Sequence, residues 1–193
     1  YVEQTQLITS VEESVFTDPL VVNFEHKPLQ LSDKVIQFDL TNDGVEEDVN
    51  FVASGSGYLV LDRNDNGQID SGSELFGPAS GSGFAELSYY DEDNNGWIDE
   101  ADNIFNQLQI WHQDESGNLK LMSLEQAGVG ALSVDATETP FSLTDNRNNE
   151  VARIAATSIL MFNDGSVSSI QELHYRTINA VDVAISSELQ IQF

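Results

Sequence analysis

Two short acidic segments carry most of the residues that could do chemistry. One runs from Asp62 to Glu74 and the other from Asp91 to Asp102, and each has a glycine at its sixth place, Gly67 and Gly96. Carboxylate and amide oxygens around such a glycine are typical of the EF-hand loop, which binds Ca²⁺ through places 1, 3, 5, 7, 9 and 12. The spacing therefore predicts two calcium sites.

The second segment follows this pattern in register. Side-chain oxygens stand at places 1, 3, 5, 9 and 12, a carbonyl fills place 7, and Ile98 is the expected apolar residue at place 8. The last ligand is an aspartate instead of the usual glutamate, so its arm is shorter. A solvated acidic turn would match only part of this register. The predicted ligands are Asp91, Asp93, Asn95, Trp97 through its carbonyl, Asp99 and Asp102.

The first segment is one residue longer, so that its glutamate comes one place late. Gly72 lies in the added step, and its conformational freedom could let the exit turn bulge until Glu74 reaches the ion. The alternative is an ordinary Asp-rich turn in which Ser71 or Ser73 caps a helix. The predicted ligands are Asp62, Asn64, Asn66, Gln68 through its carbonyl, Asp70 and Glu74.

A third acidic segment starts in register and then loses it. Its candidate ligands are Asp39, Thr41, Asp43 and the Val45 carbonyl, and a capped acidic β-turn explains the same residues equally well. The turn at Asp114–Asn118 has too few aligned oxygens and indicates a hairpin. We expect two bound Ca²⁺ ions, with this segment as the candidate for a third.

The composition supports cation binding and excludes several partners. The formal net charge is -26, which would repel nucleic acid and anionic membranes. No apolar run is long enough to insert into a bilayer, and without cysteine neither disulfides nor thiolate metal sites can form. The chain opens at Tyr1 without methionine or a signal pattern, so we expect a piece of a larger polypeptide. The expected partners are calcium ions and the rest of that polypeptide.

The elements that would position these loops are mostly of β type. Short apolar runs at Leu20–Phe24, Val35–Leu40 and Tyr58–Leu61 predict antiparallel strands, and Asn163–Gly165 predicts a hairpin turn. Helical spacing before and after the second loop predicts two flanking helices. We therefore expect an α+β fold in which antiparallel β-rich sheets flank a small helical lobe with paired EF-hand-like loops.

We expect Ile69 and Ile98 on adjacent short strands between the two ions. Residues 77–83 are interpreted as a flexible connector. The predicted organisation is a leader at 1–17, irregular or partly helical, followed by one calcium-binding domain at 18–193. That domain divides into β-rich residues 18–61, the EF-hand-like lobe 62–108 and β-rich residues 109–193.

The runs LVLDRNDNGQIDSGSELFG and GFAELSYYDEDNNGWIDEADNIFNQLQIW resemble one bacterial family. They are similar to FrpC-like, iron-regulated RTX proteins of the haemolysin type, including their self-processing module. The resemblance covers roughly residues 18 to 130. It implies a calcium-loaded module of a large protein that is secreted or lies on the bacterial cell surface.

In that module, calcium triggers cleavage of an Asp-Pro bond just before the first strand. The resemblance places Asp18 and Pro19 at this bond, as the catalytic pair of an autocatalytic cleavage. One departure is clear, because the family continues into a DLDGDG motif where this chain has Val21–Lys27. Proline also commonly starts a strand or fixes a turn, which is the plain alternative for Pro19.

Other functions have less support. The histidines His26, His112 and His174 lie in no zinc-ligand spacing, and no phosphate-binding glycine loop or serine nucleophile motif occurs. A glycosidase-like pair of acids stays open, whereas nothing at residue level supports an adhesive module. The preferred function is a calcium-binding structural module without enzymatic activity, and the alternative is calcium-triggered cleavage of its own Asp18–Pro19 bond.

Overall fold

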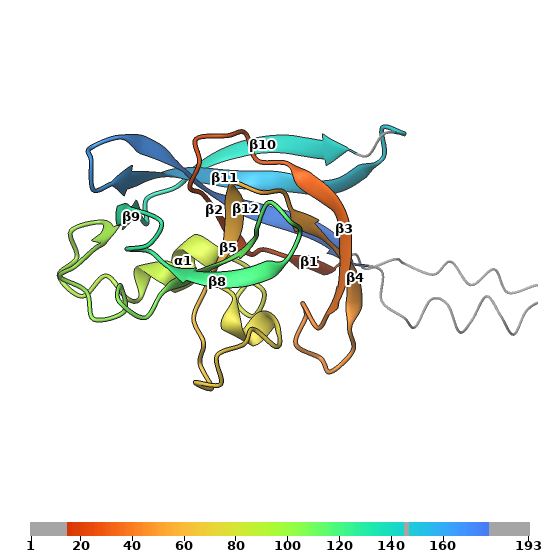
Figure 1. The fold of residues 1–193 in the computed structure, drawn as a ribbon, viewed down its shortest axis with the longest axis horizontal. Helices are drawn as coiled ribbons and strands as arrows, with labels where there is room; N and C mark the ends of the chain where they lie inside the picture. The colour runs from red at the N-terminus through yellow and green to blue at the C-terminus, as the bar shows by residue number, and fades with distance from the viewer. Residues whose placement is uncertain (1–14, 145–146, 178–193) are drawn as a thin grey trace, which may run out of the picture.

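The computed structural model describes residues 15–144 and 147–177, and these form a fold made almost entirely of strands (Figure 1). The strands are β1 (Val15–Thr17), β2 (Leu20–Asn23), β3 (Leu31–Phe38), β4 (Glu47–Val52), β5 (Ser56–Val60), β6 (Trp97–Ile98), β7 (Gln109–Gln113), β8 (Leu119–Ser123), β9 (Val129–Ser133), β10 (Thr137–Thr144), β11 (Glu150–Phe162) and β12 (Val167–Thr177). The helices are η1 (Gly72–Glu74), a single 3₁₀ turn, and α1 (Gly83–Ser88).

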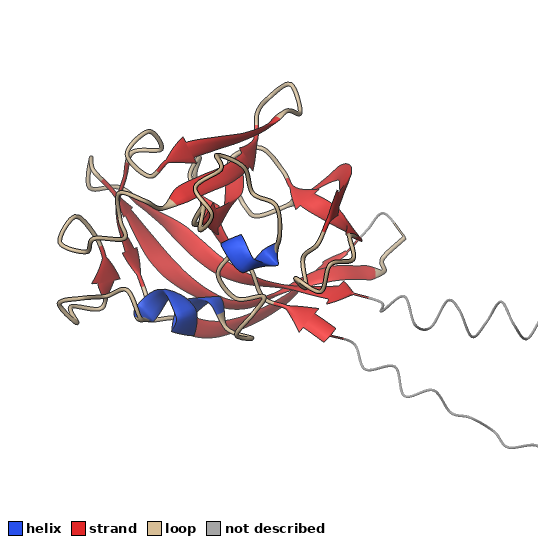
Figure 2. Ribbon diagram, turned by 90° about the horizontal axis from the view of Figure 1, so that it is seen from below, coloured by secondary structure: helices blue, strands red, loops and turns tan. Residues whose placement is uncertain are grey.

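One curled antiparallel sheet of ten strands dominates the molecule (Figure 2). Its path is β6-β9-β11-β12-β2-β5-β7-β8, with β1 added to β12 and β10 added to β11. The β11–β12 hairpin is its longest part and turns at Asn163–Gly165, as the sequence predicts. Along β11 the buried residues Leu160 and Phe162 alternate with the exposed Ile159 and Met161, so that one face of this strand meets the core.

The inner strands are buried on both faces. In β2, Leu20 and Val22 enter one apolar cluster and Val21 enters a second cluster on the other side of the sheet. The first cluster lies under α1 and the segment after Asp102, and the second is covered by the separate β3–β4 hairpin. Strands buried on both sides read as continuous apolar runs, which is the pattern at Leu20–Val22.

The expected α+β fold with a helical lobe is wrong. Residues 62–108 are all described, and their regular helices are the three-residue η1 and the six-residue α1. The stretch from Asn103 to Leu108 forms separate turns before β7 begins. Neither acidic loop is therefore a helix-loop-helix EF-hand.

The helical spacing after the second loop has another cause. Ile104, Phe105 and Leu108 are all buried in the first cluster, because successive turns direct them inward. A periodicity of three to four residues is common to a helix and to a series of tight turns. The periodicity therefore indicated that these side chains are buried, and it did not require a helix.

The expected pairing of the two loops is also wrong. Ile98 lies in β6, which pairs with β9 through Leu132, and Ile69 packs against the opposite apolar cluster. The first loop instead adjoins the third segment, since Asp39 forms a parallel bridge with Ser71. Non-local strand pairing thus separates two loops that are close in the sequence.

Most of the predicted leader (residues 1–14) and the end of the predicted β-rich region 109–193 (residues 178–193) lie outside the described residues. Of the leader, residues 15–17 form β1, which pairs with β12. In the described part of the chain, no helix is long and apolar enough to cross a membrane.

Candidate metal centres

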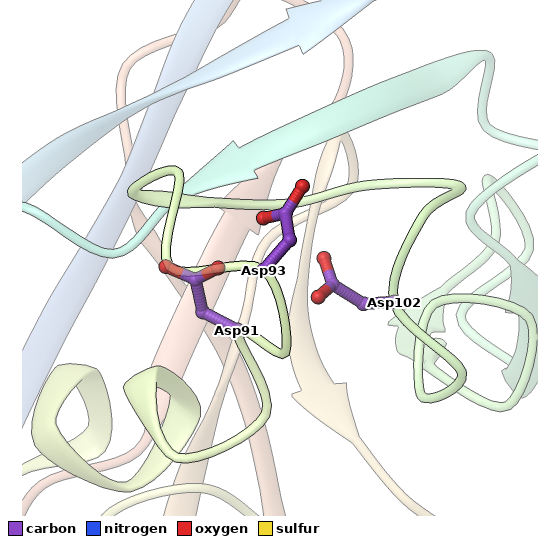
Figure 3. A group of neighbouring side chains, drawn as sticks. All are labelled: Asp91, Asp93 and Asp102. Atoms are coloured by element: carbon purple, nitrogen blue, oxygen red, sulfur yellow. The ribbon is translucent and has the colours of Figure 1, made fainter.

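Three aspartates of the second loop converge on one point (Figure 3). A carboxylate oxygen from each of Asp91, Asp93 and Asp102 lies within 4.8 Å of the others. Two ligands of one Ca²⁺ ion, each about 2.3–2.6 Å from it, stand at most about 5 Å apart. The three carboxylates would repel one another without a cation, and their spacing suits one shared ion.

The backbone of this loop is held by its own side chains. Asp91 accepts the N–H groups of Asn95 at 3.1 Å and Gly96 at 2.9 Å. Asn94 and Gly96 both have positive φ, 57° and 86°, so the chain turns sharply enough to bring places 1 and 5 together. Asn95 in turn accepts the Trp97 N–H at 2.7 Å.

Asp102 closes the loop from its far end. It is 1% exposed, and its two oxygens accept the N–H groups of Glu92 at 2.7 Å and Asp99 at 3.0 Å. Tight turns, and no helix, follow Asp102 in the chain. This path lets the short aspartate side chain contact both sides of the loop. An open hollow lined by Asp93, Asn95 and Asp99 gives solvent access to the same loop.

The first loop has the same backbone conformation. Asp62 accepts the N–H groups of Asn66 at 3.1 Å and Gly67 at 2.7 Å, and Asp65 and Gly67 have φ of 57° and 78°. Asn64 accepts the Asn66 N–H as well, at 3.0 Å. The Gln68 N–H donates to the Asn66 side chain at 2.8 Å, and the amide nitrogens of Asn64 and Asn66 contact the Asp70 carboxylate.

Glu74 returns to this loop in spite of its late position. Ser71 caps η1, and the turn places the Glu74 Oε2 atom 2.8 Å from the Asp70 N–H. Glu74 is 2% exposed, and its other oxygen, Oε1, is buried without a hydrogen-bond partner among the described residues. An orphaned buried carboxylate oxygen costs free energy unless a cation meets it. The residues present therefore fit a cation at this loop.

Gly72 has a different role from the one expected. A side chain there would meet the Leu40 carbonyl oxygen at 1.9 Å, so Gly72 allows two backbone segments to touch. The Gly72 N–H donates to the Asp39 carbonyl at 2.8 Å at the same contact. Close approach, and not a bulge, explains the glycine.

The third segment adopts the loop conformation of the other two. Asp39 accepts the N–H groups of Asp43 and Gly44, each at 3.0 Å, and Asn42 and Gly44 have φ of 57° and 88°. The Val45 N–H donates to the Asp43 carboxylate at 2.9 Å. A capped turn and a metal-binding loop both contain these hydrogen bonds, so the bonds fit either interpretation of this segment.

Glu47 is the residue of this segment that the sequence reasoning missed. Its Oε2 accepts the Leu40 N–H at 2.8 Å, as Asp102 accepts that of Glu92, and its Oε1 accepts the Thr41 hydroxyl at 2.9 Å. The sequence contained a signal for this residue, because Glu47 stands at the ninth place of its segment, as Asp70 and Asp99 do in the other two loops.

The Asp18–Pro19 peptide lies between β1 and β2, alongside β12, with which both strands pair. The Pro19 carbonyl accepts the Leu173 N–H at 3.0 Å. Gly77 packs directly on the Asp18 carbonyl, since a side chain at Gly77 would lie 1.9 Å from that oxygen. Residues 77–83 are therefore not a loose connector but a packed loop, held by the Glu86 carboxylate, which accepts the Gly77 N–H at 2.9 Å.

Asp18 sits among other titratable groups. It is 4% exposed, with its Oδ1 atom 3.1 Å from His174 Nε2, and His174 also contacts Glu172 at 3.3 Å. The pKa of Asp18 is raised to about 6, because burial raises it more than the positive charge of His174 lowers it, and the negative charge of Glu172 adds to the rise. Sequence spacing gave no signal for these partners, since they come from the opposite end of the described chain.

A sequence profile of the SPM domain matches residues 20–176. The chain belongs to the SPM domain family. Its match to the iron-regulated protein FrpA of Neisseria meningitidis serogroup C is 34% identical over 109 residues. That alignment covers 50% of this chain and 10% of the FrpA sequence.

These matches confirm the resemblance to iron-regulated proteins of this kind at the level of the family. An SPM domain that spans about a tenth of a bacterial relative is consistent with a domain of a larger polypeptide. The matched range of the SPM domain includes all three acidic loops, as well as Glu172 and His174. Its first residue, Leu20, directly follows the Asp18–Pro19 pair.

Proposed function

We propose that this SPM domain is a calcium-binding module of a larger protein that bacteria secrete or carry on the cell surface. The observation that carries the proposal is the buried Oε1 atom of Glu74, which lies in an acidic loop without a hydrogen-bond donor among the described residues. A cation at the first loop would satisfy that oxygen. Oxygen-only ligand sets of this kind suit Ca²⁺ better than transition metals.

The second loop supports the same proposal through its three converging aspartates. Both loops belong to a chain with a net charge of -26, whose self-repulsion a bound divalent cation lowers. Binding to the folded state alone stabilises it, by about 2.7 kcal/mol when free calcium is about 100 times the dissociation constant. Calcium is then a folding ligand, which suits a domain without disulfides.

Thermal unfolding of the 193-residue chain tests this function. We expect excess Ca²⁺ to raise the melting temperature by roughly 5–10 °C over a chelator control, on the size scaling of domains of this length. Equimolar Mg²⁺ should raise it much less, because Mg²⁺ demands a tighter octahedral shell. Identical melting curves in calcium and in chelator would reject the proposal.

A second function, cleavage of the chain at Asp18–Pro19, is favoured by the packing around this bond. In this reaction one Asp18 carboxylate oxygen attacks the Asp18 main-chain carbonyl carbon and closes a five-membered anhydride ring. The C–N bond to Pro19 breaks, its electron pair stays on the proline nitrogen, and that nitrogen takes up one proton. Water then opens the anhydride and leaves Asp18 as a new C-terminal residue.

The structure around Asp18 suits this geometry in two respects. The carboxylate is buried, so that little water competes for it, and the Gly77 backbone holds the carbonyl that would be attacked. Proximity and orientation of this kind are the main sources of rate in an intramolecular reaction.

Mass spectrometry of the chain after incubation with Ca²⁺ tests the cleavage. We expect two fragments, residues 1–18 and 19–193, whose appearance requires calcium and stops in Asp18→Ala. An Asp48→Ala variant, which removes an exposed carboxylate from β4, is the matched control and should be cleaved like the unchanged chain. A chain that stays whole in calcium over days would leave calcium binding as its only proposed function.

A further inference from the structure

Three titratable side chains form a cluster behind the Asp18–Pro19 bond. The Nε2 atom of His174 lies 3.1 Å from Asp18 Oδ1 and 3.3 Å from Glu172 Oε1. Both carboxylates are more than nine-tenths buried. Asp18 Oδ1 has no hydrogen-bond partner among the described residues, and its contact with His174 is an ion pair when the histidine is protonated.

Glu172 is anchored on its other side. Its Oε2 atom accepts the Ser82 hydroxyl at 3.3 Å and the Phe84 N–H at 3.4 Å, both at the start of α1. Its Oε1 atom is left to face His174. One carboxylate thus ties the histidine to the same packed loop that presses on the Asp18 carbonyl.

We propose that His174, held in place by Glu172, is a catalytic residue for cleavage of the Asp18–Pro19 bond, as the cation that keeps Asp18 ionised and as the source of the proton that the proline nitrogen gains. This inference rests on the cleavage function proposed above. A histidine beside the reacting carboxylate is neither a calcium ligand nor part of any acidic loop.

The proton balance of the reaction supports this role. Attack requires an ionised Asp18, and departure of Pro19 requires one proton on its nitrogen. An Asp18 carboxylate paired with a His174 imidazolium holds one negative charge and one transferable proton. After cleavage the anhydride, the neutral imidazole and the neutral secondary amine of Pro19, which now carries the transferred proton, account for the same atoms and the same net charge.

The electrostatics explain why a cation is needed here. Burial raises the pKa of Asp18 to about 6 and Glu172 adds to the rise, so both effects favour the unreactive acid form. His174 is the group that opposes them. The loop at residues 77–82 contributes no charged side chain, and the acid of α1 nearest to it, Glu86, is paired with Arg63 at 2.8 Å.

Rates of cleavage in calcium, measured from pH 5 to pH 8 on the full chain, test the proposal. His174→Gln keeps a hydrogen-bonding side chain but carries no charge, and we expect it to cleave at least 10-fold more slowly near pH 7. It should also lose the fall in rate at alkaline pH, where the unchanged chain loses the imidazolium. His112→Gln, at a half-buried histidine of β7, is the control and should keep the unchanged rate and profile.

Glu172→Gln provides an independent variant. Without the negative charge beside it, His174 loses its proton more readily and Asp18 ionises more readily, so the whole profile of rate against pH should move to lower pH. A purely structural role for the cluster would lower the melting temperature without moving the profile.

The outcomes separate the two proposals. If the unchanged chain cleaves and His174→Gln matches it in rate and profile, the histidine has no part in the reaction and the cleavage function stands. If the profile of rate against pH is unchanged in Glu172→Gln, the histidine likewise has no part in the reaction. This second test can be made even if His174→Gln fails to fold. If the unchanged chain does not cleave in calcium, the cleavage function and the role of His174 both fall.

Discussion

Glu74 accepts the backbone N–H of Asp70 at 2.8 Å and leaves its second carboxylate oxygen buried without a hydrogen-bond donor in the described part of the chain. A residue that stands one place late in the sequence thereby returns to its loop. The turn of η1 and the close contact of Gly72 with Leu40 make this return possible.

Replacing this glutamate tests its role at the first loop. Glu74→Gln keeps the size of the side chain and an oxygen for the Asp70 N–H but removes the charge. We expect calcium affinity at one site to fall at least 10-fold, about 1.4 kcal/mol, in isothermal titration calorimetry. Glu100→Gln removes an exposed charge from the second loop and should change affinity much less. Equal affinities for Glu74→Gln and the unchanged chain would exclude Glu74 as a ligand.

Gly77 should tolerate no side chain. Gly77→Ala adds a methyl group 1.9 Å from the Asp18 carbonyl oxygen, at a backbone φ of 117°. Strain and overpacking together should cost about 2–5 kcal/mol of unfolding free energy in urea denaturation. Gly165→Ala is the matched control, because its φ is 84° and its surroundings are open, so that only the strain of about 1–2 kcal/mol applies. Equal losses of unfolding free energy in the two variants would show that the loop at residues 77–83 moves away from Asp18 to accommodate the methyl group.

Two buried tyrosines should contribute unequally to stability. The Tyr175 hydroxyl donates to the Asn50 carbonyl at 2.8 Å, which leaves the Tyr58 hydroxyl as the donor in their 2.6 Å contact. Tyr58→Phe removes one bond and should cost about 1 kcal/mol. Tyr175→Phe leaves both the Tyr58 hydroxyl and the Asn50 carbonyl without their partner, so it should cost about 2–3 kcal/mol. Urea denaturation measures both, and a larger loss in Tyr58→Phe would reverse the assigned donor.

Asp18 should make the folded state less stable as the pH rises. Its folded pKa of about 6 is above its unfolded value of about 3.9. The folded state therefore holds the proton more tightly, and the stabilisation is complete below the unfolded pKa and lost as the pH passes through about 6. Asp18→Asn has no such titration. Measured without calcium, it should gain on the order of 2 kcal/mol relative to the unchanged chain between pH 4 and pH 7. A difference that stays constant with pH would show that His174 fully compensates the burial.

Local patterns in the sequence determined the loops and several strands. The positive φ at Asn94 and Gly96 and the hydrogen bonds that Asp91 accepts involve residues within six places of one another, so the sequence was sufficient to predict the register of the loop. The β11–β12 hairpin follows from the turn residues at Asn163–Gly165 in the same way. These features depend on backbone preferences that act over a few residues.

The tertiary structure alone decided which of these local features meet. Pairing of β6 with β9 separates Ile98 from Ile69, while the bridge of Asp39 to Ser71 joins the first loop to the third. Pairing of β12 with β1 and β2 brings His174 to Asp18 across nearly the whole described chain. Strand pairing is set by which apolar faces can be buried together, and the spacing of residues along the sequence does not record that choice.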